Sequence, residues 1–266
     1  MTNTPQDTPP ILSKDEIEAD DSLANSPIID HLVELRRRLV KVFAGVLVIF
    51  LALIGFSRQL YDFFSDPLVA QLPANASMIA TDVTTPFMAP LRLTLFVAAF
   101  IAMPYILYQV WAFVAPGLYK KEKKIAIPIL LASVVLFYAG VAFAYFIVLQ
   151  GVLKFFIVFS PENVLPMTDI NSYLSFAMKL FLVFGATFEI PVVTLLLVLA
   201  GVVSTEALED KRRYIIVGCF AVAAIVTPPD GVSMLMLAIP MWLLFELGLV
   251  LAKVLVKEKQ TNAVVG

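Results

Sequence analysis

Long apolar stretches alternate with short charged ones along the chain between residues 39 and 252. A helix that crosses the hydrocarbon core of a bilayer needs about 20 predominantly apolar residues. Six stretches reach or approach this length: Leu39–Phe56, Phe87–Val114, Ile125–Leu149, Tyr173–Val203, Tyr214–Val226 and Val232–Ala252. The pattern therefore predicts an all-α membrane protein with six transmembrane helices, in a transmembrane domain spanning residues 28–253.

The fifth stretch is the shortest. At about 1.5 Å per residue its apolar part is about 20 Å long, whereas the hydrocarbon core is about 30 Å thick. Only residues 227–231, which include two prolines and a glycine, separate it from the sixth stretch. We therefore expect a tight and short hairpin of the fifth and sixth helices, with a locally thinned bilayer around it.

Composition supports a membrane protein over a soluble helical one. Hydrophobic residues make up 60% of the chain and charged residues only 15%, whereas soluble domains have about 25% charged residues. A soluble protein this apolar would have too little polar surface to remain in solution. The net charge of −2 gives no indication of nucleic-acid binding.

Lysine and arginine are distributed unequally between the two sides of the predicted bundle. Fifteen of them lie on the side that holds both termini, against Arg58 and Lys154 on the other side. Loops rich in lysine and arginine stay in the cytoplasm, so the pattern predicts an inner-membrane protein with both termini in the cytoplasm. Residues 1–27 are acidic and resemble no signal peptide, and we interpret them as a disordered tail. Residues 254–266 would form a short cytoplasmic tail.

Motifs for reaction chemistry are missing from the sequence. It contains one cysteine, Cys219, and one histidine, His31, and it has no glycine-rich phosphate loop or metal-ligand spacing. We therefore expect no catalytic residue, cofactor or metal. What remains is a set of carboxylates in unusual places.

Glu189 is the most unusual of these carboxylates, because it lies at membrane depth, where an ionised side chain costs several kcal/mol. It should therefore face a bundle interior or a wet cavity, or be protonated, and Pro191 beside it should kink the helix. The local sequence pattern predicts that Glu34 pairs with Arg38 at i,i+4 on one helix face. Glu122 lies among four lysines, and the same local view predicts that it compensates their charge. Glu246 and Lys179 are near helix ends, where side chains can snorkel or pair locally.

These residues resemble the TatC family, the multispanning receptor subunit of the twin-arginine protein translocase. The matching stretches include HLVELRRR at 31–38, MIATDVTTPF at 78–87, PYILYQVWAFVAPGLYKKEKK at 104–124, TDINSYLSF at 168–176, FGATFEIPV at 184–192 and TPPD at 227–230. The resemblance covers residues 31–252 in the family's order. Two features depart from it, namely the acidic tail and Lys179, where a small or apolar residue is expected.

The resemblance implies a cup-like bundle and transport of folded proteins driven by the proton gradient. It implies TatB- and TatA-type single-span partners, twin-arginine signal peptides as ligands, contact with membrane lipids, and more than one copy in the complex. Glu34 and Glu122 would receive the two arginines, supported by Arg36 and Phe113. The remaining roles that it implies are a structural cap holding Pro67, a buried carboxylate at Glu189 and an acidic external turn at Asp230.

The same resemblance implies that single-span partners dock on the bundle. We expect them on the lipid-facing side of the last two helices, because their short hairpin leaves that edge open, with Met234, Leu237 and Met241 as candidate contacts. Two other function classes remain open from the residues themselves. A secondary transporter would use Glu189 as its coupling carboxylate, and a structural subunit of a respiratory complex would use none of these groups. Binding of a twin-arginine peptide would separate the first interpretation from both.

Overall fold

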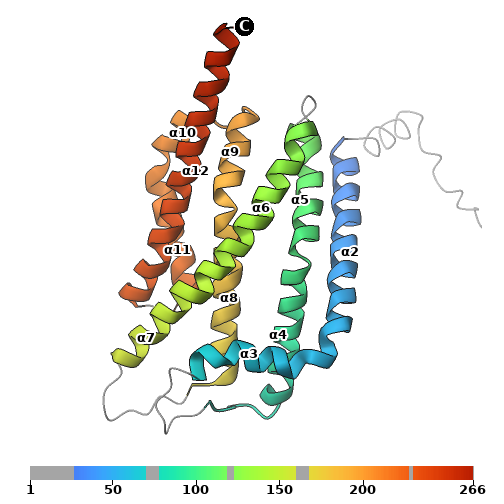
Figure 1. The fold of residues 1–266 in the computed structure, drawn as a ribbon, viewed down its shortest axis with the longest axis vertical. Helices are drawn as coiled ribbons and strands as arrows, with labels where there is room; N and C mark the ends of the chain where they lie inside the picture. Colours follow the sequence, from blue (N-terminus) through green and yellow to red (C-terminus); the bar gives the residue numbers. More distant parts are fainter. Residues whose placement is uncertain (1–26, 70–77, 119–122, 160–167, 228–229, 266) are drawn as a thin grey trace, which may run out of the picture. The chain divides into compact units, whose positions relative to one another are not determined.

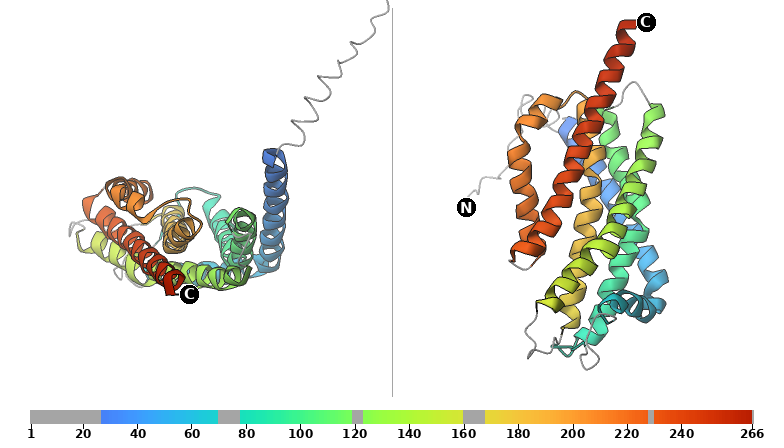
Figure 2. Two further views of the ribbon diagram at one scale, coloured as in Figure 1. Left: turned by 90° about the horizontal axis from the view of Figure 1, so that it is seen from above. Right: turned by 60° about the vertical axis from the view of Figure 1, so that its left-hand side comes forward.

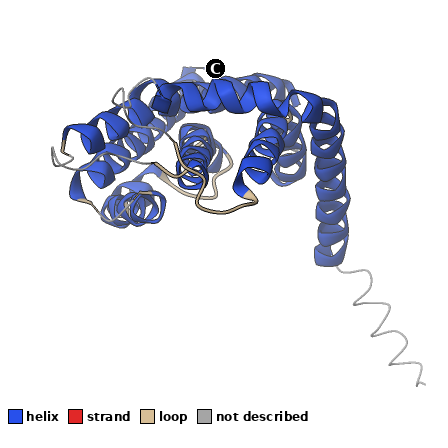
Figure 3. Ribbon diagram, turned by 90° about the horizontal axis from the view of Figure 1, so that it is seen from below, coloured by secondary structure: helices blue, strands red, loops and turns tan. Residues whose placement is uncertain are grey.

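The computed structural model describes residues 27–69, 78–118, 123–159, 168–227 and 230–265, and these ranges consist of helices and connecting loops (Figure 3). The chain divides into two compact units, residues 1–44 and 45–266. The helices are α2 (Pro27–Leu53), η1 (Ile54–Phe56), α3 (Ser57–Val69), α4 (Thr85–Ile101), α5 (Met103–Leu118), α6 (Lys123–Phe143), η2 (Ala144–Leu149), α7 (Gln150–Val158), α8 (Ile170–Phe188), α9 (Ile190–Leu199), α10 (Thr205–Asp210), α11 (Arg212–Val226) and α12 (Gly231–Val265) (Figure 1).

All six predicted stretches are helical, so the all-α membrane fold is confirmed. Among the described residues, four helical runs are long and apolar enough to cross a membrane, and α4 with α5 makes a fifth as one bent span. The sixth crossing depends on α11, which has only 15 residues. α11 packs along α12 in the short hairpin that the sequence predicts (Figure 2).

The second predicted helix is in fact two helices, α4 and α5, which meet at a bend of 54°. Pro104 lies one residue into α5 and has no backbone N–H, so the carbonyl of Phe100 loses its helical donor. The hydroxyl of Tyr138 on α6 donates to that carbonyl at 2.8 Å. A tertiary hydrogen bond therefore satisfies the group that the proline releases, which makes the bend tolerable within a membrane.

Two of the connections between the predicted apolar stretches contain helix. In the segment from Ser57 to Pro86, α3 occupies the first 13 residues. The segment from Gln150 to Ser172 begins with α7, so helix continues from α6 through the π-helical η2 as far as Val158. Residues 1–26, which hold nearly all of the predicted acidic tail, lie outside the described residues.

Close helix packing in the second unit depends on small residues. A Cβ atom on Gly140 of α6 would lie 2.6 Å from the Phe184 carbonyl oxygen of α8, and one on Gly248 of α12 would lie 2.7 Å from the Pro191 Cα atom of α9. Backbones can approach this closely only where no side chain intervenes. Around these crossings lies a core of buried side chains that includes Leu93, Leu149, Leu180, Phe181, Phe184 and Leu237.

Candidate functional site

Glu34 lies on α2 in the first unit and forms the local ion pair that its spacing predicts. The Nε and Nη2 atoms of Arg38 donate to Glu34 Oε1 at 2.9 and 2.6 Å. The Glu34 side chain is nevertheless 38% exposed, so it is accessible to a ligand. It lies in a surface hollow of about 350 Å³ lined by Val33, Glu34, Arg37, Arg38 and Lys41.

Of the other predicted peptide-binding residues, the structure describes Arg36 and Phe113 but not Glu122. Arg36 is exposed on α2, and Phe113 is half-buried on α5. Glu122 lies outside the described residues, so its place beside Glu34 stays a prediction. Pro67 lies within the helix α3.

Glu189 is the residue between α8 and α9, where the helical run is interrupted as Pro191 predicts. Both of its carboxyl oxygens are screened from solvent, and within the described ranges neither makes a hydrogen bond of acceptable geometry. The hydroxyl of Ser133 on α6 lies near the carboxyl group. The side chain borders a cavity of about 230 Å³, whose other lining residues are Leu107, Val110, Trp111, Val193, Leu196 and Leu197.

Asp230 caps the start of α12. Its Oδ1 atom accepts from the backbone N–H of Ser233 at 2.7 Å, which satisfies one of the free donors at the helix N-terminus. Its Oδ2 atom and the Ser233 hydroxyl are buried and make no hydrogen bond within the described part of the chain. The acid of the turn after α11 thus has a clear structural role.

Sequence reasoning missed a set of contacts that we call the Asp169 clasp, formed by Thr81, Asp169 and Ser172. The Oδ1 atom of Asp169 accepts from the backbone N–H and the hydroxyl of Thr81, and Oδ2 accepts from the same two groups of Ser172. Backbone hydrogen bonds between Ile79 and the segment 168–170 reinforce the clasp. The two segments belong to stretches already noted for their family resemblance, but their pairing was not predicted.

The structure places Glu246 and Lys179 well inside α12 and α8, and not near the helix ends where the sequence predicts them. Glu246 on α12 pairs with Arg212 of α11, with 2.9 Å between Oε2 and Nη2, which confirms local pairing. Lys179 is exposed on α8. Its exposure is compatible with snorkelling toward the membrane surface.

Two of the three proposed contact residues on α12 are in the wrong place for docking. Leu237 and Met241 are 0% and 4% exposed and belong to the core, and Met234 packs against that core. The outward side of α12 instead presents Leu235, Ile239, Leu243, Leu247 and Val250. The prediction was therefore wrong for Leu237 and Met241, because both lipid-facing and core-facing positions of a membrane helix are apolar. Met234 is half-buried, and its contact stays a prediction.

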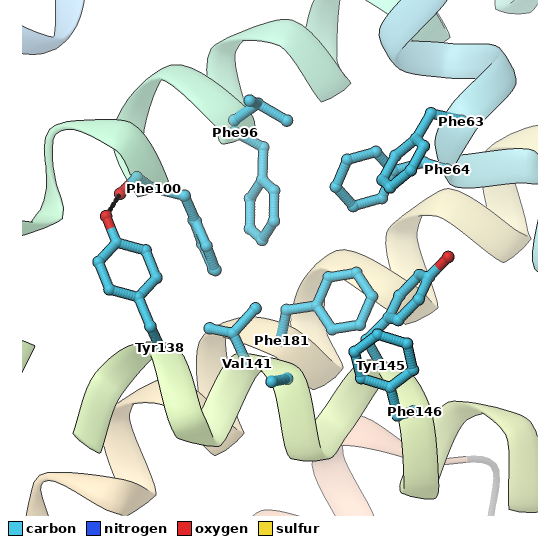
Figure 4. Close-up of a pocket in the computed structure, with 11 residues that line it drawn as sticks. Phe63, Phe64, Phe96, Phe100, Tyr138, Val141, Tyr145, Phe146 and Phe181 are labelled. Carbon is cyan, nitrogen blue, oxygen red and sulfur yellow. Dashed lines mark hydrogen bonds between the residues drawn. The ribbon is translucent and has the colours of Figure 1, made fainter. Parts of the chain in front are cut away.

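An aromatic cavity of about 310 Å³ lies between α3, α4, α6, η2 and α8 (Figure 4). Its walls are almost entirely apolar and include Phe63, Phe64, Phe96, Phe100, Tyr145 and Phe181. The rings of Phe63 and Tyr145 stack with an interplanar angle of 3°. The cavity contributes no titratable group to the candidate site beyond tyrosine hydroxyls.

Known proteins match most of the chain. The family described as Sec-independent protein translocase protein (TatC) matches residues 30–240. TatC proteins of Azotobacter chroococcum and Haemophilus influenzae are 52% and 50% identical, over 86% and 90% of this chain and 89% and 94% of their own lengths. A crystal structure described as the twin arginine translocase receptor TatC aligns with a TM-score of 0.77 at 37% identity, covering 84% of this chain and 98% of that one.

The fold is that of a multi-pass, all-helical membrane protein, and the proteins that it matches are components of protein transport. The chain belongs to the TatC family of Sec-independent protein translocase proteins. This membership decides against the small-solute transporter and the respiratory assembly subunit that the residues alone left open.

Proposed function

We propose that this protein is the receptor and core of a twin-arginine translocase in the inner membrane, with both termini in the cytoplasm. The observation that carries the proposal is the family membership, together with the likeness to a solved structure described as the twin arginine translocase receptor. The chain would bind twin-arginine signal peptides and assemble with TatA- and TatB-type single-span subunits. It would use the proton-motive force to export folded proteins.

Glu34 and Glu122 are the proposed acceptors for the two peptide arginines. A guanidinium group is a planar fork that can donate two parallel hydrogen bonds to one carboxylate. Arg38 already donates two of its nitrogens to Glu34, so this carboxylate is oriented to accept a guanidinium group. An incoming arginine would displace Arg38, and Arg36 and Phe113 are the proposed supporting residues.

Glu189 is the proposed intramembrane contact in the same function. Both carboxyl oxygens are buried and accept no hydrogen bond from the described residues. Because a buried acceptor without a donor is costly, a donor from elsewhere, such as the helix of a single-span subunit, would be favoured. Asp230 and Pro67 would act structurally, through the cap of α12 and through α3.

Peptide titration tests the receptor role. Purified protein is titrated with a signal peptide that carries Arg-Arg and with its Lys-Lys variant. A charge-assisted hydrogen bond contributes about 1.5–3 kcal/mol, so Glu34→Ala and Glu122→Ala should each weaken Arg-Arg binding by about ten- to a hundredfold. Glu206→Ala is a matched control, because Glu206 is an exposed glutamate on α10, which the loop charges also place in the cytoplasm.

The peptide comparison also tests the fork geometry. The wild type should prefer Arg-Arg, because an ammonium group cannot donate in the same bidentate way. If Glu34→Ala and Glu122→Ala bound both peptides as the wild type does, the two carboxylates would not be the receptor site. If no version of the protein discriminated the peptides, the receptor function itself would be wrong.

A further inference from the structure

Three side chains from different elements converge beside the cavity at Glu189. Trp111 comes from α5, Ser133 from α6, and Glu189 from the break between α8 and α9. The Nε1 atom of Trp111 and the Oγ atom of Ser133 are 3.0 Å apart. Ser133 is fully buried, and its hydroxyl lies near the Glu189 carboxyl group.

The chemistry of these groups fixes the direction of the contacts. An indole N–H can only donate, so the Ser133 oxygen must accept from Trp111. Ser133 keeps one proton of its own, which can go to a nearby acceptor. The Glu189 carboxyl group offers that acceptor, since neither of its oxygens has a hydrogen-bond partner within the described residues.

We propose that Trp111 and Ser133 are positioning residues for Glu189. In this relay the Trp111 N–H donates to the Ser133 hydroxyl, and the Ser133 hydroxyl turns to donate to the Glu189 carboxyl group nearby; the structure contains the first of these two hydrogen bonds and leaves the second open. The relay holds the carboxyl group at the cavity wall, where it can meet a donor from a partner. This inference rests on the proposed function of Glu189 in export.

The surroundings of the cavity explain why a relay is needed. Apart from Trp111 and Glu189, the cavity is lined by aliphatic side chains from α5 and α9, none of which can hold a carboxyl group. Glu189 also lies where the helical run is interrupted, so its own helix gives it less restraint. In the competing explanation, Ser133 donates to the carbonyl one turn back in α6, as buried helical serines often do, and Trp111 simply ties α5 to α6.

Fluorescence separates these explanations, because the chain has only two tryptophans. In a Trp242→Phe background, Trp111 is the only tryptophan. Full-length protein in lipid nanodiscs is compared with Glu189→Gln, Ser133→Ala and the double variant in that background. With a relay, Glu189→Gln shifts the Trp111 emission maximum when Ser133 is present, and the shift is lost when Ser133 is alanine.

Ser233→Ala is the matched control, since it removes another fully buried serine hydroxyl, on α12. It should leave the response of Trp111 to Glu189→Gln unchanged. Ser133→Thr keeps a hydroxyl group and should restore the response that Ser133→Ala removes. The relay is wrong if Glu189→Gln shifts the emission equally with and without Ser133, or shifts it in neither.

Export of a twin-arginine reporter provides the second readout. Ser133→Ala should slow export by about two- to tenfold, the size expected for one hydrogen bond. The double variant should be no slower than Glu189→Gln alone. Normal export by Ser133→Ala beside slow export by Glu189→Gln would overturn the relay and leave the proposed function standing. Normal export by Glu189→Gln would instead remove Glu189 from that function, while fluorescence would still decide whether the relay exists.

Discussion

Asp169 joins two segments that are far apart in the sequence through a single carboxylate. It receives hydrogen bonds from Thr81, 88 residues earlier, and from Ser172 in the first turn of α8. These bonds favour the charged form of the side chain, so the pKa of Asp169 lies below its ordinary value. The hydrogen bond from the backbone N–H of Ser172 is the largest cause of the lowered pKa, and desolvation of the carboxyl group, the second largest, acts in the opposite direction.

The lowered pKa predicts how the clasp responds to pH. A carboxyl group whose pKa is lower in the folded than in the unfolded protein contributes stability above its unfolded pKa of about 3.9. That contribution is lost as the pH falls through the folded value. We therefore expect Asp169→Asn to lower the thermal midpoint by a few degrees at pH 7, and the difference from the wild type to shrink toward pH 3.

Asp82→Asn is the control for this measurement, because among the described residues the carboxylate of Asp82 accepts hydrogen bonds only from Thr84, in its own turn. Its effect should be smaller. A difference between Asp169→Asn and the wild type that stays constant from pH 7 to pH 3 would contradict a role for the carboxylate charge in the clasp.

At the scale of the element, glycine positions decide how closely the helices pack. Adding a methyl group at Gly140 or Gly248 would bring it to 2.6 or 2.7 Å from backbone atoms of α8 or α9, which cannot move as a side chain can. We expect Gly140→Ala and Gly248→Ala each to destabilise the protein by about 1–3 kcal/mol, the usual cost of overpacking. Unfolding in mixed micelles of mild detergent and dodecyl sulfate measures the change.

Gly218 on α11 provides a matched helical control, because a methyl group there meets nothing within 4 Å. Gly218→Ala should be neutral, or stabilising by up to about 1 kcal/mol through helix propensity. Destabilisation by Gly218→Ala equal to that of Gly140→Ala would mean that the close approach of α6 and α8 is not the cause.

The short helix α11 makes a separate prediction about the bilayer. Its 15 residues span about 22 Å, which is less than the hydrocarbon thickness of about 30 Å. Spin labels at exposed positions such as Val217 and Ile225 should therefore show a thinner hydrocarbon layer beside α11 than beside α6. Equal thickness at both helices would refute the thinning.

The helices themselves were predictable from sequence because apolar length and proline positions are local properties. Pro104 and Pro191 each mark a real interruption, but the bend at α4–α5 also depends on Tyr138, a residue from another helix. The local pattern also predicted the Glu34–Arg38 pair, whose members are four residues apart. It missed the Thr81–Asp169 contact, whose members are 88 residues apart. It also failed for Leu237 and Met241, since hydrophobicity cannot separate a core-facing from a lipid-facing position.

At the scale of the whole molecule, the functional proposal requires that two kinds of site face different compartments. The peptide-binding carboxylates must lie in the cytoplasm, where precursors are made, and the clasp must lie outside. The unequal distribution of lysine and arginine is the only observation that assigns these sides, with fifteen cations against two.

Single-cysteine labelling tests this assignment directly. The native Cys219 is buried and is first replaced by alanine. Arg58, Lys154 and Lys211 are exposed and belong to connections on the two predicted sides. In intact spheroplasts, a membrane-impermeant maleimide should label Arg58→Cys and Lys154→Cys, whereas Lys211→Cys should react only after the membrane is opened. Labelling of Lys211→Cys from outside would place α10 and α11 the other way round, and a cytoplasmic receptor face built on Glu34 and Glu122 would then be untenable.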